Sequence, residues 1–467
     1  MPDQNARTSG SLFGGVFARG SAIIDDRAWL QAMLDAEAGL ARALERAGLA
    51  PAGAGEAVTR AARANDFDIA ELGELSALTG NPVPGLARVL AMRVGGQQGR
   101  AVHRGATSQD ILDTAAMLLA RTAIDAARAD LTAAAAAAAE LAREHRTTPM
   151  IGRTLLQQAV PVTFGAVAAG WLAALDAAIT GLAETRRTRL AVQFGGAAGT
   201  LASLGPDGIR VKALLADELE LADPPLPWHT ERLRIIDVGA AMARVTAALS
   251  KIARDVTLLA QTEVAEVAEG GGGPDGGGTG APRRGGSSAM PNKSNPVAAV
   301  AVLGCAKQAP GLLATLVASA EQEHQRAAGA WHAEWQPYGH LLQVAASAAS
   351  WGAELLANLE VDTGKMAANL TAAGGLPLAE RVSALLRNAI GAAEAHDLVA
   401  TAAAKAATSG VPLHDILLAD PDLEDKLTKA GITQAHIEQA LDPAGYLGAA
   451  ADFTDAALAA HESGVSR

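Results

Sequence analysis

The sequence has 467 residues and a formal net charge of −12 at pH 7, which argues against nucleic acid or an anionic membrane surface as a partner. Hydrophobic residues make up 49% of it but aromatic residues only 3%, because alanine dominates. Alanine is the best helix former and a poor core filler, so we expect long helices packed along alanine-lined faces. A single cysteine, Cys305, excludes a disulfide framework and a cysteine-based metal site. The chain begins without the residue order of a signal peptide, and we expect a soluble, cytoplasmic protein.

The helical pattern divides the chain into three predicted parts. Residues 1–105 are expected to form a compact helical domain, in which an amphipathic helix follows Asp25 and ends near Gly48. Residues 106–361 hold the longest helical segments, and residues 362–467 indicate shorter helices with more glycine, proline and aspartate. No stretch shows convincing alternation with β-branched residues. We therefore predict an all-α fold, with a central long-helix bundle flanked by two smaller helical domains.

The clearest periodic signal lies between Ile235 and Leu259. Two series of apolar residues each repeat every seven positions and together form an a/d seam. They are Ile235, Met242, Leu249 and Val256, and Val238, Val245, Ile252 and Leu259. A seam this regular predicts a bundle of long helices. Such a bundle can form within one chain or be shared between subunits.

Residues 286–296, GSSAMPNKSNP, follow a glycine-rich run and precede an Ala/Val-rich helical segment. Glycine lets the backbone fold over a ligand, the helix start offers free N–H groups to an anion, and Lys293 adds a positive charge. The segment predicts a mobile lid over a negatively charged small molecule, within a signature loop at residues 269–296. For residues 269–284 alone, a passive Gly/Pro linker is the better interpretation.

Two further polar segments lie at predicted helix junctions. In residues 103–110, HRGATSQD, the hydroxyl and carboxylate side chains are good N-capping groups, so a simple helix cap explains them. The alternative is a carboxylate-binding corner of hydroxyl and amide groups beside His103. Residues 152–161, GRTLLQQAVP, join the first long helix to the next one.

No metal or cofactor template fits the sequence. The ten histidines are scattered, no HExxH or CxxC pattern occurs, and the run GGGGPDGGGTG lacks the strand context of a dinucleotide-binding fingerprint. We therefore expect no metal and no organic cofactor. His103 and His229 differ from most of the other histidines because they lie in polar junctions punctuated by glycine or proline.

The three segments resemble the motifs of the fumarase/aspartase superfamily, and they follow one another along the chain in the order found in that superfamily. Residues 286–296 match its signature loop, G-S-S-x-M-P-x-K-x-N-P, and residues 107–115 and 152–165 are similar to its other two motifs. The resemblance implies a homotetramer whose central helices form a joint bundle, which would explain why the heptad seam has no obvious partner within the chain. It also implies that each active site combines the three motifs from three different subunits and binds a small polycarboxylate.

The resemblance also assigns roles to individual residues. Ser287 matches the serine usually taken as the catalytic base on the closing loop, and His103 is a second catalytic candidate beside the first binding region. Serine is a poor base, so closure would have to place its oxyanion among backbone N–H groups and Lys293. The substrate-binding candidates come from the motifs and from the segment PWHTERLRI, which resembles one branch of the superfamily. They are Thr107, Ser108, Gln109, Thr154, Gln157, His229, Arg232, Lys293 and Asn295.

Leu155 decides the expected reaction. Fumarases and the amidine and amine lyases carry histidine there, where it helps to protonate a leaving group, whereas a carboxylate, with a pKa near ~4, needs no such acid. Leu155 thus resembles the cycloisomerase branch, which implies lactonisation of 3-carboxy-cis,cis-muconate to 4-carboxymuconolactone in the protocatechuate branch of the β-ketoadipate pathway. One alternative is an adenylosuccinate- or argininosuccinate-type C–N lyase that releases fumarate. Another is a structural helical protein that has lost activity.

Overall fold

The computed structural model describes residues 12–270, 285–286, 290, 293–420, 423, 427–428 and 431–465. The chain forms two compact units, each built from three separate stretches. Unit 1 contains the described residues of Met1–Thr132, Ala177–Ala253 and Val300–Ala353, and unit 2 those of Ala133–Asp176, Arg254–Ala299 and Glu354–Arg467. The division into three successive domains at residues 105 and 361 stays a prediction.

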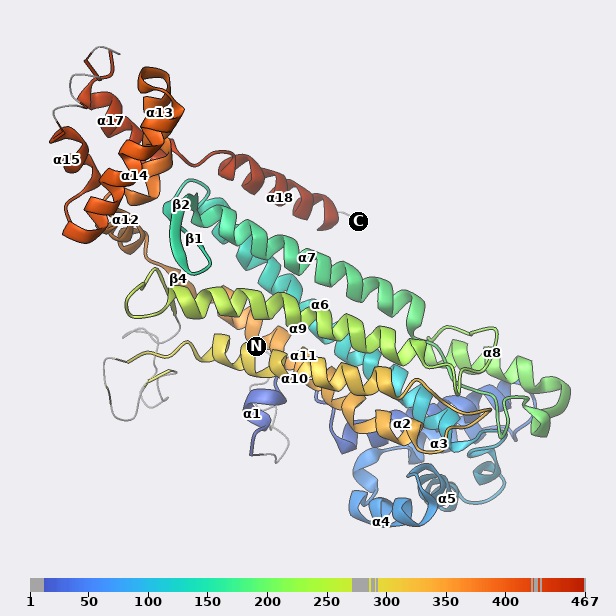
Figure 1. Ribbon diagram of the computed structural model, residues 1–467. Coiled ribbons are helices and arrows are strands. Elements are labelled where there is room, and N and C mark those ends of the chain that lie inside the picture. The colour runs from blue at the N-terminus through green and yellow to red at the C-terminus, as the bar shows by residue number, and fades with distance from the viewer. Residues whose placement is uncertain are drawn as a thin grey trace. The chain divides into compact units, whose positions relative to one another are not determined.

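Five long helices each contribute one part to each unit and dominate the all-α fold (Figure 1). They are α6 (Ser108–Glu144), α7 (Phe164–Arg189), α9 (Leu233–Leu259), α10 (Val297–Ala318) and α11 (Ala330–Ala357). The alanine-rich composition explains their length, since alanine loses no side-chain entropy in a helix. The prediction of an all-α chain with long helices is confirmed.

The heptad seam of α9 has partners inside the chain, so the expectation that it has none is wrong. All eight seam residues are buried. Within unit 1, a Cβ added at Gly239 of α9 would lie 2.9 Å from Leu316 of α10, and one at Gly352 of α11 would lie 2.5 Å from Leu249 of α9. Such close approach, permitted by glycine, lets α9 pack against α10 and α11. Periodicity predicted the buried face of α9 correctly but could not identify what covers it.

The shorter helices of unit 1 are α1 (Gly14–Phe17), α2 (Asp26–Arg46), α3 (Ala54–Ala61), α4 (Ile69–Thr79), α5 (Val83–Val94) and α8 (Gly208–Leu219), with 3₁₀ turns at Ala64–Asp66, Gln98–Ala101 and Ala202–Asp207. Two of them begin at a side-chain cap, α2 at Asp25 and α4 at Asp68. The side chain of Asp25 accepts a hydrogen bond of 2.9 Å from the Ala28 amide and caps α2. Gly39 lies against Leu219, which brings α8 close to α2.

Unit 2 contains an element that the sequence did not predict. Strands β1 (Pro149–Thr154) and β2 (Gln157–Thr163) form an antiparallel hairpin between α6 and α7, and β3 (Val267–Glu269) pairs with β4 (Leu359–Val361). The register of the hairpin shifts between Ile151 and Arg153. A Cβ on Gly152 would lie 2.4 Å from the Val160 carbonyl oxygen, so glycine is required there. The bulge and Pro161 obscure the alternation that would have revealed these strands.

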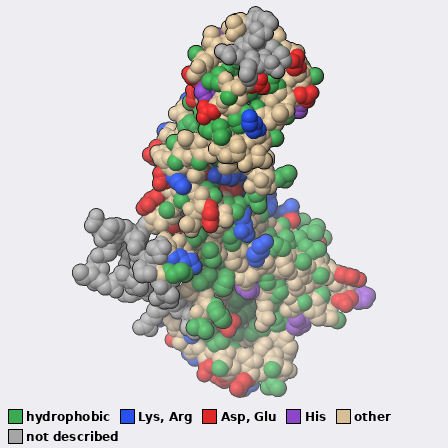
Figure 2. Space-filling model, turned by 60° about the vertical axis from the view of Figure 1, so that its left-hand side comes forward, with side chains coloured by type: hydrophobic (Ala, Val, Ile, Leu, Met, Phe, Trp, Pro, Cys, Tyr) green, Lys and Arg blue, Asp and Glu red, His purple; other side chains and the backbone are tan. Residues whose placement is uncertain are grey.

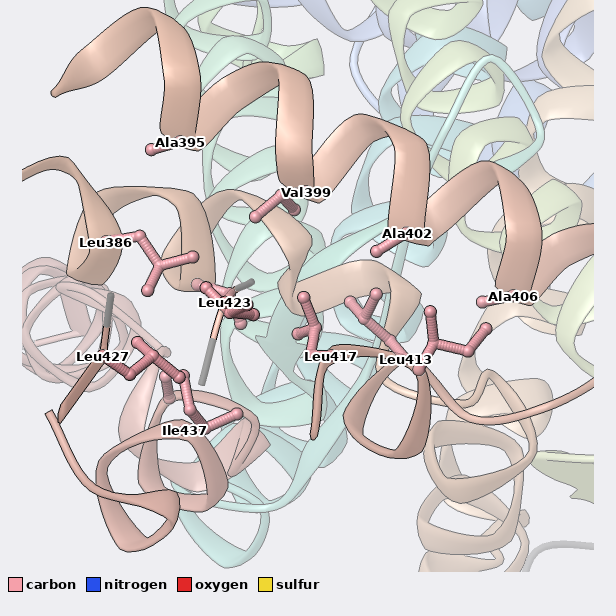
Figure 3. Close-up of a cluster of buried hydrophobic side chains, with 13 residues drawn as sticks. Leu386, Ala395, Val399, Ala402, Ala406, Leu413, Leu417, Leu423, Leu427 and Ile437 are labelled. Atoms are coloured by element: carbon pink, nitrogen blue, oxygen red, sulfur yellow. The ribbon is translucent and has the colours of Figure 1, made fainter. Parts of the chain in front are cut away.

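The third stretch of unit 2 consists mainly of shorter helices. They are α12 (Thr363–Ala372), α13 (Ala379–Ile390), α14 (Ala392–Ser409), α15 (Leu413–Leu418), α17 (Gln434–Ala440) and α18 (Ala450–Val465), with 3₁₀ turns at Leu376–Leu378 and Pro443–Gly445. Figure 3 shows how Leu386, Val399, Leu413, Leu417 and Ile437 from four of these helices converge on one apolar core. These four helices share a core of their own, which agrees with the shift to shorter helices predicted from residue 362 onwards.

Two long apolar helices are only partly buried, and one of them, α10, exposes the side chains of Val300 and Val317. Helices α7 and α10 are long and apolar enough to cross a membrane by length and composition, but only 39% and 33% of their most apolar windows are buried. Figure 2 shows hydrophobic side chains scattered among acidic and basic ones over the described part of one face. A single chain therefore does not cover these two helices completely.

Candidate active site

His103 is held by a buried carboxylate. The backbone N–H of His103 donates to Glu37 Oε2 over 2.8 Å, and its Nδ1 lies 2.7 Å from Glu37 Oε1. Glu37 is fully buried in α2. Because a carboxylate only accepts hydrogen bonds, Glu37 favours the tautomer with the proton on Nδ1. The Nε2 atom is then the ring nitrogen left to exchange a proton. Burial lowers the pKa of His103, but the hydrogen bond and charge of Glu37, with Asp110, raise it on balance above its ordinary value.

The start of α6 is fixed by Asp110. Its carboxylate accepts from the backbone amides of Thr107 (2.9 Å), Gly195 (3.0 Å) and Gly196 (2.9 Å). The bond to Thr107 is half of a capping box, so the helix-cap interpretation of this segment holds. Ser108 is the first residue of α6, and both hydroxyl-bearing side chains are half-buried at this helix start. The capped turn thus presents Thr107 and Ser108 close to free helix N–H groups, where an anion binds well.

His229 and Gln109 lie beneath this turn in a buried polar network. The Nε2 atom of His229 is 2.6 Å from Asp110 Oδ1. Gln109 Nε2 donates to the His229 carbonyl over 2.7 Å and to Asp113 over 3.1 Å. The Gln109 Oε1 atom has no hydrogen-bond partner among the described residues. The structure therefore brings these two candidates together, but below the surface rather than at it.

Arg232 forms a buried triad with Asp113 and Glu334. Its Nη1 donates to Asp113 over 2.8 Å, its Nη2 to Asp113 over 3.0 Å and to Glu334 over 2.7 Å, and its Nε to Glu334 over 3.1 Å. With two long contacts from Nη1 to backbone carbonyls at 3.4 Å, all five N–H groups are used. Burial raises the pKa of Glu334, and Arg232 opposes that shift. The triad argues against a direct contact between Arg232 and substrate.

Thr154 and Gln157 flank the tip of the β1–β2 hairpin in unit 2. They pair with each other across the turn formed by Leu155 and Leu156, whose φ angles are +52° and +64°. Two positive φ values define a type I′ turn, which normally needs glycine, asparagine or aspartate. The leucine side chains are 96% and 74% exposed. Backbone strain and exposed apolar surface thus coincide at the position that decides the expected reaction.

Lys293 and Asn295 lie immediately before α10, also in unit 2. The Asn295 side chain and its backbone amide both donate to the Gly285 carbonyl over 2.9 Å, and Gly286 bridges to Ser294. The Lys293 side chain is exposed. Ser287, the predicted catalytic base, lies outside the described residues. The two ends of the signature segment are therefore joined at its base.

The candidates fall into two groups. His103, Thr107, Ser108, Gln109, His229 and Arg232 belong to unit 1, and Thr154, Gln157, Lys293 and Asn295 to unit 2. Sequence reasoning missed Glu37, Asp113 and Glu334. The available signal was weak: each is an acidic residue on the buried face of a helix, and such residues are rarely buried unless paired. Among the described residues, no cluster of His, Cys, Asp and Glu could hold a metal ion.

Comparison with known proteins places this chain in a family. Residues 19–311 match the family described as Lyase, and residues 375–457 match the one described as Adenylosuccinate lyase C-terminus. The chain belongs to the fumarase/aspartase superfamily. This agrees with the order of the three motifs along the chain.

Individual members of the superfamily match over nearly their whole length. A 3-carboxy-cis,cis-muconate cycloisomerase of Bradyrhizobium diazoefficiens is 44% identical over 440 residues, covering 94% of each chain. A nitrosuccinate lyase of Streptomyces davaonensis is 44% identical over 448 residues, covering 94% of this chain and 91% of the relative. The crystal structure of the 3-carboxy-cis,cis-muconate lactonizing enzyme from Pseudomonas putida superimposes with a TM-score of 0.88 at 37% identity, covering 97% and 99% of the two chains.

Proposed function

We propose that the protein is a cycloisomerase that converts 3-carboxy-cis,cis-muconate to 4-carboxymuconolactone. The observation that carries this proposal is Leu155, which places an apolar, exposed side chain between Thr154 and Gln157 where an acid would otherwise stand. Lactonisation needs no acid for a leaving group, because the attacking group is a carboxylate that is ionised at neutral pH. Relatives of this name at 42% and 44% identity support the proposal.

The proposed mechanism is an intramolecular addition. A carboxylate oxygen of the substrate bonds to the far alkene carbon, and the alkene electron pair moves towards a second carboxylate as an enediolate-like charge. Lys293, Asn295 and the start of α6 stabilise that charge, and Ser287 delivers a proton to the neighbouring carbon. Substrate and product are isomers, so the step needs no cofactor. His229 and Arg232 contribute by holding Thr107 and Ser108 in place.

A second candidate reaction is elimination of nitrite from nitrosuccinate. It is favoured by the 44% identity to a nitrosuccinate lyase. Nitrite is the anion of an acid about as strong as a carboxylic acid, so it also leaves without the acid that Leu155 replaces. Here a base removes a proton, the C–N bond breaks, and fumarate and nitrite form. An amine is a much poorer leaving group, which disfavours the adenylosuccinate-type reaction.

We also propose that the active enzyme is a homotetramer that shares its sites between subunits. Its support is the partial burial of α7 and α10, with Val300 and Val317 of α10 exposed, together with the exposed leucines of the hairpin tip. Other copies of the same chain would cover these surfaces, because the removal of hydrophobic surface from water is favourable in free energy. A small polycarboxylate is the proposed substrate class, and the cytoplasm the proposed location.

The test uses purified protein without added metals. Loss of the diene absorbance of 3-carboxy-cis,cis-muconate is measured for the wild type, for Ser287→Ala and for Ser288→Ala, and nitrite release is measured with nitrosuccinate. Rapid diene loss that Ser287→Ala abolishes and Ser288→Ala retains would support the cycloisomerase and its serine. Nitrite release without diene loss would favour the lyase. The absence of both signals would refute both reactions.

A further inference from the structure

Strand β3 supports two of the candidate binding segments of unit 2. The strand has only three residues and pairs with β4. Glu266 immediately precedes it, and Glu269 is its last residue. Each carboxylate makes a pair of hydrogen bonds to a different segment, one to the hairpin and one to the start of α10.

Glu266 holds the hairpin through Arg153. The Nη1 and Nη2 atoms of Arg153 donate to the two carboxylate oxygens of Glu266, both over 2.8 Å. Asn369 of α12 donates to Glu266 Oε1 over 2.8 Å and to the Val264 carbonyl over 2.9 Å. Glu266 is fully buried. The fork geometry fixes both distance and angle, so Arg153 is held in one orientation.

Arg153 directly precedes Thr154 in β1. Fixing its guanidinium therefore fixes the backbone that carries Thr154 and, through the pair across the turn, Gln157. On one side the hairpin borders an open pocket of about 570 Å³, with Arg153, Leu156 and Asn369 in its wall, so close packing does not hold that side. The polar anchor replaces the close packing that would otherwise fix a hairpin.

Glu269 acts in the same way on α10. Its two oxygens accept from the backbone amides of Ala298 (3.0 Å) and Ala299 (2.8 Å) in the first turn of that helix. Pro296, which precedes α10, has no side-chain acceptor to cap it, so Glu269 supplies the cap from another segment. Lys293 and Asn295 lie directly before this capped turn.

The backbone leading into Glu266 is strained. Ala265 has a φ of +51°, a left-handed conformation that alanine rarely adopts. Its amide is held by the Gln261 carbonyl over 2.7 Å. This turn directs the chain from the end of α9 into β3, so the strain coincides with the placement of the Glu266 carboxylate.

We propose that Arg153 and Glu266 are positioning residues, which hold Thr154 and Gln157 at the geometry that binds the substrate. Neither touches the reacting atoms. Arg153 belongs to the second motif of the superfamily, but its guanidinium faces the protein rather than the ligand. The inference rests on the proposed function, because Thr154 and Gln157 are its proposed binding residues.

The test compares Glu266→Gln and Arg153→Lys with the wild type in the full-length protein. Glu266→Gln removes the charge, whereas Arg153→Lys keeps a counter-ion for Glu266 and loses only the fork, so it is the safer variant for folding. Arg146→Lys is the matched control, because Arg146 makes a bidentate pair with Asp455 over 2.6 Å in the same unit. Amide hydrogen exchange over residues 149–163 and the values of kcat and KM are measured.

We expect hairpin exchange to rise at least about tenfold in both variants, since the opening of the hairpin no longer breaks a bidentate ion pair. The KM should rise, and kcat/KM should fall by about 10–100-fold, because small displacements of binding groups cause losses of this size. Arg146→Lys should change neither. A merely structural pair would lower kcat in proportion to the folded fraction and leave KM unchanged.

Unchanged hairpin exchange would overturn the proposal, and so would faster exchange with an unchanged KM. If the wild type converts neither 3-carboxy-cis,cis-muconate nor nitrosuccinate, the proposed function fails. The exchange data then decide separately whether Arg153 and Glu266 anchor the hairpin.

Discussion

Replacing Arg232 by methionine tests the buried triad most directly. Methionine has about the length of the arginine stem, so the change removes the charge and the N–H groups while leaving little empty space. Asp113 and Glu334, both buried, would then face each other without a cation. Each carboxylate would lose two charge-assisted hydrogen bonds or more.

The expected loss of unfolding free energy is about 3–5 kcal/mol, the usual cost of leaving a buried charge without its partner. Roughly 1.4 kcal/mol is a factor of ten in the folding equilibrium constant, so the change lowers that constant by about two to nearly four orders of magnitude. Arg186→Met is the control. Arg186 also binds a carboxylate, Asp125, over 2.6 and 3.1 Å, but both side chains are more than 40% exposed, and exposed pairs contribute about 1 kcal/mol at most.

Urea unfolding followed by circular dichroism, at one fixed protein concentration, measures both variants. The pH dependence adds a second check. Without Arg232 the folded-state pKa of Glu334 rises further above its unfolded value, so folding takes up a proton. The loss of unfolding free energy is then fully present at high pH, and it becomes smaller as the pH falls through the folded-state pKa of Glu334. A loss below about 1 kcal/mol that does not depend on pH would refute the reasoning.

Three further predictions concern single contacts. Glu37→Gln should lower the pKa of His103, measured by NMR, and an unmoved pKa would contradict the pairing. The raised pKa of His103 stabilises the fold below about pH 6.5, and this stabilisation is lost as the pH rises through the folded-state pKa, so the variant should show a weaker dependence of stability on pH. Leu155→Asn should slow amide exchange in the hairpin and stabilise it by up to about 1 kcal/mol, because asparagine tolerates a positive φ; faster exchange would argue against a strained turn. Leu413→Ala should cost about 2–5 kcal/mol in thermal unfolding, because Leu413 is fully buried in the cluster of Figure 3, whereas Leu226→Ala, at an exposed site, should cost little.

The local sequence pattern predicted the helices well because a helix is made of contacts three and four residues apart. The seam from Ile235 to Leu259 lies within the observed α9, Leu233–Leu259. The hairpin was missed for an equally local reason. Its turn is Leu155-Leu156 rather than a glycine- or asparagine-containing pair, and the bulge at Gly152 breaks the alternation.

The three motifs, the family and the loss of an acid at Leu155 are properties of short segments, and the sequence by itself determined them. The partners of those segments are not local. Glu37 lies 66 residues from His103, and Arg232 lies 119 residues from Asp113 and 102 from Glu334. Only the tertiary structure decided that Arg232 is neutralised from within the chain. The physical reason is that burial and charge pairing depend on which distant segments meet, and no periodicity in one segment records its partner.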